Sequence, residues 1–196
     1  MPHSSVAADS EDQQFKIQNS KLKTAAALVI GVGTPDRGDD AVGREIARRV
    51  RTAAPGGVRV VEASGEGTAL MDAWRGVETV ILCDAAQSGA PAGTVHRLEA
   101  HVQPVPDRLF RYSTHAFGVA QAIELARVLG ELPSRVIVYG VEGAGFAAGA
   151  GLSPAVAQAV EGVVDAVLGE LAALPALLST QYSLAGPGAP GGDPHA

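Results

Sequence analysis

Cysteine is scarce in this chain and long apolar runs are absent, and each of these features narrows the classes of protein to which the chain can belong. The 196 residues include one cysteine, Cys83, which excludes an internal disulfide and any zinc or iron–sulfur site built from several cysteines. No apolar run reaches the roughly 18 residues that a membrane-spanning helix requires, so we expect no membrane partner. The first residues lack the basic start and apolar core of a secretory signal. These features predict a cytoplasmic protein.

An excess of positive charge is also missing. The formal net charge is −6, whereas non-specific binding to nucleic acid needs a basic surface. We therefore expect no nucleic-acid partner. Roughly 150 residues have globular composition, which fits one domain with a sizeable core. Residues 1–24 and 174–196 are polar or rich in Pro, Gly and Ser, and we expect them to be disordered tails around a domain at residues 25–173.

The stretch 25–42, AAALVIGVGTPDRGDDAV, organises the domain. The apolar run at residues 25–30 predicts a buried strand, which a glycine-rich turn and a polar loop separate from an amphipathic helix starting near Ala41. Strand, turn and helix in this order are the opening unit of a parallel α/β sheet. Further strands are predicted at residues 58–63, 79–85, 94–99 and 135–141, and further helices at 69–74, 115–129 and 154–173. We expect Ser113 or Thr114 to cap the helix at 115–129 and Ser153 to cap the last.

Three residues with metal-binding side chains follow separate predicted strands or open a helix: Asp40, Asp84 and His115. If the sheet is parallel, their loops project from the same edge, where ligands bind in open α/β sheets. Two carboxylates and an imidazole suit a borderline divalent ion such as nickel or zinc, with positions left for substrate or water. A helix N-terminus would favour the carboxylate of Asp40 and keep the His115 ring neutral.

Each of these residues also has an ordinary structural explanation. Asp39 or Asp40 is placed to cap the first helix, Asp84 could form a turn, and a histidine at a helix start is often structural or exposed. Cys83 lies in an apolar strand and is expected in the core, where the neighbouring Asp84 would raise its pKa. We expect surface roles for His96 and His101.

Four motifs in order resemble the [NiFe]-hydrogenase maturation protease family. They are the segment 31–43 (GVGTPDRGDDAVG), the strand and turn at 80–93 (VILCDAAQSGAPAG), the helix start at 113–115 (STH), and the late loop at 140–154 (GVEGAGFAAGAGLSP). The resemblance covers roughly residues 25–171. This chain has Asp40 where the family usually has Glu, and Thr34 where it often has Asn.

The resemblance implies a single-domain α/β fold with a twisted, mostly parallel sheet of about five strands and helices on both faces. It implies an endopeptidase that removes a C-terminal peptide from a [NiFe]-hydrogenase large-subunit precursor after nickel insertion. By motif position, Asp40, Asp84 and His115 would hold the nickel, which the precursor presents and for which zinc or cadmium could substitute. We expect a monomer that acts on a protein substrate.

The predicted chemistry is metal-assisted amide hydrolysis, with Asp39 or Asp84 as general base. The glycine-rich loops could admit an extended peptide, so Gly33, Thr34, Gly65, Gly67 and Thr68 are candidate substrate-binding residues. Two alternatives remain at this stage. One is a non-catalytic nickel-binding maturation or chaperone module that uses the same three ligands. The other is a nucleoside hydrolase or phosphorylase, which is disfavoured because Arg37 is the only basic residue in the first loop.

Overall fold

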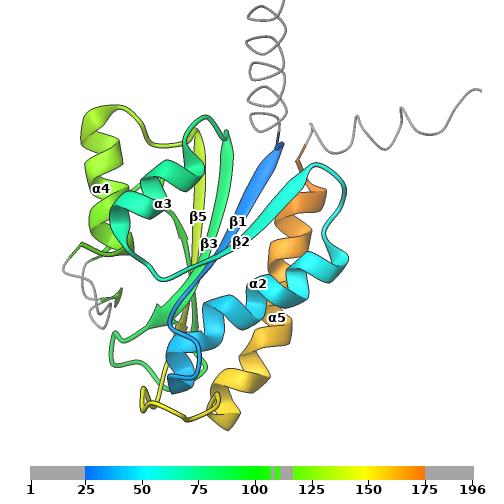
Figure 1. Cartoon of the computed structure of the whole chain (residues 1–196), viewed down its shortest axis with the longest axis vertical. Coiled ribbons are helices and arrows are strands. Elements are labelled where there is room, and N and C mark those ends of the chain that lie inside the picture. The colour runs from blue at the N-terminus through cyan, green and yellow to red at the C-terminus, as the bar shows by residue number, and fades with distance from the viewer. Residues whose placement is uncertain (1–24, 107–108, 111–116, 175–196) are drawn as a thin grey trace, which may run out of the picture.

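The computed structural model describes residues 25–106, 109–110 and 117–174 (Figure 1). The tail predicted at residues 1–24, and that predicted at 174–196 apart from its first residue, lie outside this part of the chain. That first residue, Leu174, is 6% exposed and packs in the core, so the folded domain reaches one residue beyond the predicted boundary.

Five strands form one sheet in the order β2-β1-β3-β5-β4. Their bounds are β1 Ala27–Val32, β2 Val58–Ala63, β3 Thr79–Ala86, β4 Val95–Glu99 and β5 Arg135–Glu142. Neighbours among β2, β1, β3 and β5 run parallel, and β4 pairs antiparallel with β5 at the edge. The structure therefore confirms the predicted mostly parallel sheet of five strands, with strand ends that differ from the predictions by no more than two residues.

Helices cover both faces of the sheet (Figure 1). On one face lie α2 (Val42–Ala53) and α5 (Pro154–Ala172), and on the other lie α3 (Gly67–Trp74) and α4 (Val119–Leu129). Strand side chains alternate between the faces: Val29 packs toward α2 and α5, whereas Leu28 and Ile30 pack toward α3 and α4. Because both faces are buried, the central strands read as continuous apolar runs rather than as alternating patterns.

A close approach between α2 and the sheet aligns the first helix with the strands. Gly43 in the first turn of α2 lies so near the backbone carbonyls of Val32 and Cys83 that a Cβ there would overlap both oxygens. Glycine at this position lets the helix N-terminus reach the ends of β1 and β3. The short 3-10 helix η1 (Gly38–Ala41) precedes α2 and carries Asp39 and Asp40 to the same edge.

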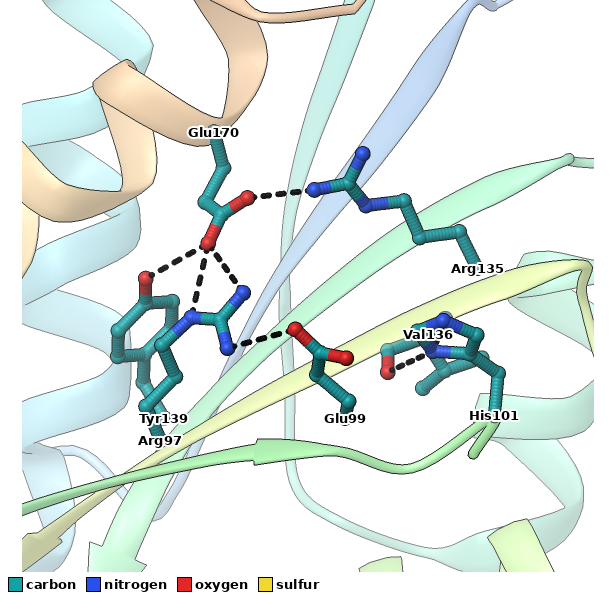
Figure 2. A network of polar contacts seen from close by, with 7 residues as sticks. All are labelled: Arg97, Glu99, His101, Arg135, Val136, Tyr139 and Glu170. Carbon is teal, nitrogen blue, oxygen red and sulfur yellow. Dashed lines mark hydrogen bonds and ion pairs between the residues drawn. The ribbon is translucent and has the colours of Figure 1, made fainter. Parts of the chain in front are cut away.

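The last helix is held to the antiparallel edge of the sheet by an ionic network (Figure 2). Glu170 of α5 accepts from Arg97 of β4 at 2.8 Å and from Arg135 of β5 at 2.7 Å. The hydroxyl of Tyr139 also donates to Glu170, at 3.4 Å, and Arg97 reaches Glu99 at 2.9 Å. The network joins β4, β5 and α5, whose relative positions are not set by the apolar pattern of the sequence alone.

The structure changes what was predicted for the starts of two helices. The helix predicted at residues 115–129 begins at Val119 after Gly118, and the candidate caps Ser113 and Thr114 lie outside the described residues. Ser153 does precede α5, with Pro154 as its first residue, but its side chain makes no capping bond among the described residues.

No helix in the described part of the chain has the length and apolarity to cross a membrane.

Candidate active site

A small cleft opens at the carboxyl ends of β1 and β3, and Asp40 and Asp84 both line it. Its volume is about 20 Å³, close to the room that one water molecule or metal ion requires. The other lining residues come from the ends of β1 and β3, from the loops that follow β1, β2, β3 and β5, and from the segment before α4: Val32, Gly33, Ser64, Ala85, Ala86, Gln87, Phe110 and Phe146. The position agrees with the rule that ligands bind beyond the carboxyl ends of parallel strands.

Asp84 reaches the cleft from within β3 and is 7% exposed. Burial raises the pKa of Asp84 to about 8; the backbone N–H of Ala85 donates to Oδ1 at 2.8 Å and opposes the rise, whereas the nearby Asp40 carboxylate adds to it. A carboxylate with an elevated pKa in a cleft marks a candidate functional residue, since an ordinary turn former would face solvent.

Asp40 is half-buried, and its Oδ2 accepts from the backbone N–H of Thr34 at 2.9 Å. This bond closes the loop after β1 and presents Asp40 toward Asp84. The prediction that Asp39 or Asp40 caps the first helix is wrong, because Ala41 is the N-cap of α2 and no side chain among the described residues caps it.

Asp39 turns away from Asp40 and is fully buried. Its Oδ2 accepts from the backbone N–H groups of Ala144 and Gly145 at 2.8 and 3.0 Å, and its Oδ1 from that of Ser153 at 2.7 Å. Burial alone would raise the pKa of Asp39, but these bonds outweigh it and the pKa is lowered. With both oxygens occupied, Asp39 is not the free carboxylate that the predicted role of general base requires.

Backbone hydrogen bonds join the same two loops. The N–H of Asp39 donates to Gly145 O at 2.8 Å, that of Gly38 to Ala150 O at 2.9 Å, and that of Gly149 to Asp36 O at 2.6 Å. The loop after β1 and the loop after β5 therefore form one unit beside the cleft, although more than 100 residues separate them in the sequence.

Glu142, at the end of β5, is an anchor that sequence reasoning missed. Its side chain is 1% exposed and accepts from Ser88 Oγ at 2.9 Å and from the backbone N–H of Gly89 at 2.7 Å. His96 Nε2 lies 3.2 Å from Oε2, the oxygen that also accepts from Ser88, so the expected surface role of His96 gives way to a half-buried position with 24% of its side chain exposed. Glu142 fixes the loop that follows Asp84. Its signal in the sequence was a charged residue directly after the apolar run that predicted this strand.

His115 lies outside the described residues, so its predicted approach to Asp40 and Asp84 stays a prediction. Phe117, two residues after His115, is among the described residues. Its carbonyl oxygen accepts from the backbone N–H of Gly67 at 2.9 Å, at the N-terminus of α3. No group of three or more His, Cys, Asp or Glu suited to a metal occurs within the described residues. Asp40 and Asp84 supply two oxygen donors, which suit a divalent ion that brings or finds its remaining ligands elsewhere.

The predicted substrate-binding residues separate into two groups. Gly33 lines the cleft, and Thr34 follows it and supports Asp40. The other three, Gly65, Gly67 and Thr68, are not among the described cleft-lining residues. Thr68 donates through its N–H and hydroxyl to Glu66, whose side chain caps α3, and Gly67 packs against the Phe117 ring. Gly67 and Thr68 thus have roles in local structure, and peptide binding by these three residues stays a prediction.

Comparison with known proteins gives consistent matches. The sequence model of a family described as hydrogenase maturation protease matches residues 41–170. The chain is 28% identical over 155 residues to the hydrogenase expression/formation protein HupD of Rhodobacter capsulatus, which covers 78% of this chain and 74% of that protein. It is 26% identical over 117 residues to HupD of Thiocapsa roseopersicina, covering 59% of this chain and 53% of that one, so this match spans about half of that relative.

A solved structure has the same fold. The hydrogenase maturating endopeptidase HybD from E. coli superposes with a TM-score of 0.64 at 24% identity, covering 74% of this chain and 91% of that one. This likeness confirms the predicted fold class.

Proposed function

The chain belongs to the hydrogenase maturation protease family, and on this premise we propose that it is the endopeptidase that removes a C-terminal peptide from a nickel-loaded [NiFe]-hydrogenase large-subunit precursor. The family accounts for the coarser part of this statement, the processing of a hydrogenase subunit by a protease. Dependence on nickel and the C-terminal position of the cut are our proposal.

The observation that carries the proposal is that Asp40 and Asp84 line one cleft at the carboxyl ends of β1 and β3. The two carboxylates come from segments 44 residues apart and are set by different supports, Thr34 for Asp40 and the buried strand β3 for Asp84. Like charges in one small cleft oppose each other unless a cation lies between them. A cation brought by the substrate would therefore be bound there.

In the proposed reaction, Asp40 and Asp84 bind the nickel ion that the precursor carries, with His115 as the third predicted ligand. Nickel held in this way would polarise the scissile carbonyl or lower the pKa of an attacking water. Asp39 is not available as general base because backbone N–H groups occupy its oxygens, so the remaining candidate is Asp84, through an oxygen that does not bind the ion. Gly33 lines the cleft, and its missing Cβ makes room for the backbone carbonyl of Asp40, so that η1 can approach the end of β1.

The test is to incubate the protein with the large-subunit precursor from its own organism, prepared with and without nickel, and to measure the intact mass of the precursor. We expect loss of a C-terminal peptide from the nickel-loaded form alone. Tight nickel binding by the protein alone, with no cleavage of any precursor, would instead support the non-catalytic nickel-binding module. Equal cleavage of both forms would refute the dependence on nickel.

A further inference from the structure

We propose that the ring of Phe146 is an apolar wall that contacts the substrate peptide beside the bond to be cut, and that Asp39 is the positioning residue that holds it there. This inference rests on the proposed function, and it assigns Asp39 a role that acts through the loop after β5 rather than on the reacting atoms.

Phe146 stands out from its own segment. Its neighbours Gly145 and Ala147 are exposed, whereas Phe146 is half-buried and lines the cleft together with Asp40 and Asp84. The ring folds back over Gly143, where an added Cβ would overlap the ring and approach the Cβ of Asp39 to 3.1 Å. An aromatic side chain turned inward from an exposed loop, beside two carboxylates, is placed to meet a ligand.

Asp39 bonds the loop that carries Phe146 through both its side chain and its backbone N–H, and further backbone hydrogen bonds join the same loop to Asp36 and Gly38. Residues 143–151 include glycine at positions 143, 145, 149 and 151, and glycine loses more conformational freedom on ordering than any other residue. Hydrogen bonds from Ala144 and Gly145 to Asp39 lie directly before Phe146, and the bond from Ser153 fixes the far end of the loop. These charge-assisted bonds in a buried site are among the stronger ones that a protein can form.

The chemistry of the cleft selects the ligand. Asp40 and Asp84 would repel an acidic side chain, and the rings of Phe146 and Phe110 supply apolar surface on its walls. We therefore infer that an apolar side chain of the precursor peptide next to the scissile bond packs against the Phe146 ring at this wall and does not enter the 20 Å³ space between the carboxylates. An apolar contact of this size typically changes the specificity for a substrate by about tenfold or more.

The test measures kcat and KM for cleavage of the nickel-loaded precursor by Phe146→Ala, Phe146→Leu, Asp39→Asn and the double variant Asp39→Asn/Phe146→Ala. We expect Phe146→Ala to raise KM about tenfold with kcat little changed, because uniform binding is lost. Phe146→Leu should restore most of the loss. Asp39→Asn should raise KM in the wild-type background but add little to Phe146→Ala, because it acts through that ring. Val128→Ala removes an 82% exposed apolar side chain far from this loop and serves as the control.

The outcomes separate the inference from the proposed function. Failure of the wild type to cut any precursor contradicts the proposed function. If the wild type cuts, an unchanged KM in Phe146→Ala overturns the apolar wall, and a full additional effect of Asp39→Asn in the Phe146→Ala background overturns the positioning role. Should Asp39→Asn fail to fold, Gly143→Ala displaces the ring by a second route: it should raise KM in the wild type and leave KM of Phe146→Ala unchanged, and the opposite result contradicts the inference.

Discussion

Asp39 Oδ1 accepts a hydrogen bond of 2.7 Å from the backbone N–H of Ser153, 114 residues further along the chain. Glu142 makes the equivalent connection for the loop after β3, through the hydroxyl of Ser88 and the backbone N–H of Gly89. Loops at the carboxyl edge of the sheet are therefore fixed by buried carboxylates on neighbouring segments. Such support holds a site's side chains in place before the substrate arrives.

Replacing Glu142 should reveal this support as a loss of stability that depends on pH. Burial alone would raise the pKa of Glu142, but hydrogen bonds from Gly89, Ser88 and His96 lower it below the ordinary value of 4.5. The charged form therefore stabilises the fold above about pH 4.5, and this stabilisation is lost as the pH falls through the lower pKa of the folded state. We expect Glu142→Gln to reduce the free energy of unfolding by about 1–2 kcal/mol at pH 7.

Urea unfolding of wild type and Glu142→Gln between pH 3 and 7 checks this prediction. The difference between the two proteins should be full at neutral pH and shrink below about pH 4.5. Glu131→Gln, at an exposed position, should change stability little at neutral pH. A difference between wild type and Glu142→Gln that grows toward low pH would contradict the assigned direction of the pKa shift.

Gly43 and Gly162 should respond oppositely to substitution by alanine. A Cβ at Gly43 would overlap the carbonyl oxygens of Val32 and Cys83, which belong to the sheet and cannot move aside. We expect Gly43→Ala to destabilise the protein by about 3 kcal/mol. Gly162 lies in the interior of α5 with open space at its Cβ position, so Gly162→Ala should stabilise by roughly 0.5–1 kcal/mol. Thermal unfolding distinguishes the two, and a neutral Gly43→Ala would show that α2 sits further from the sheet.

Removing the charge of Glu170, which lies in the network of Figure 2, should cost more stability than removing the charge of an exposed carboxylate in a single ion pair. Glu170 is 16% exposed and bonds two arginines from two strands, whereas Asp72 is 69% exposed and pairs with Arg75 alone. Glu170→Gln should cost about 1 kcal/mol, because several charges share this network, and Asp72→Asn should cost close to nothing. Chemical denaturation measures both. Equal effects would mean that the network contributes no more than an isolated exposed pair.

Cys83 should be inert to thiol reagents in the folded protein. Burial raises the pKa of its thiol to about 12, with a smaller contribution from Asp84, and its side chain is fully enclosed in the core. Reaction with a chromogenic disulfide should be absent under native conditions and complete in denaturant, since the thiolate is the reactive form. Rapid labelling of the native protein would contradict this environment.

The central strands of the sheet could be predicted from the sequence because they are buried on both faces. The runs at Thr79–Ala86 and Arg135–Glu142 are mainly apolar, bounded by turn residues and too short for helices. The close meeting of Asp40 and Asp84 at one cleft also followed from strand order, since parallel strands bring their carboxyl ends to the same edge.

Side-chain roles in the loops could not be predicted in the same way. Asp39 and Asp40 are adjacent and chemically identical, and the local sequence predicted that either of them could cap the first helix. Only the tertiary structure distinguishes them, because the amides that occupy Asp39 come from residues more than 100 positions away. Glu142 was missed for the same reason, since its partners lie in the loop after β3.

We propose above that Asp40 and Asp84 act together as one nickel-dependent site. Precursor cleavage by Asp40→Asn, Asp84→Asn and the double variant tests this directly, with Asp72→Asn as an exposed control. Asn preserves the size of each side chain and removes its charge, so folding checked by circular dichroism should be unchanged. We expect each single variant to lose at least a hundredfold in cleavage of the nickel-loaded precursor, the double variant to lose little more, and Asp72→Asn to behave as wild type. Cleavage at the wild-type rate by either Asp40→Asn or Asp84→Asn would contradict it.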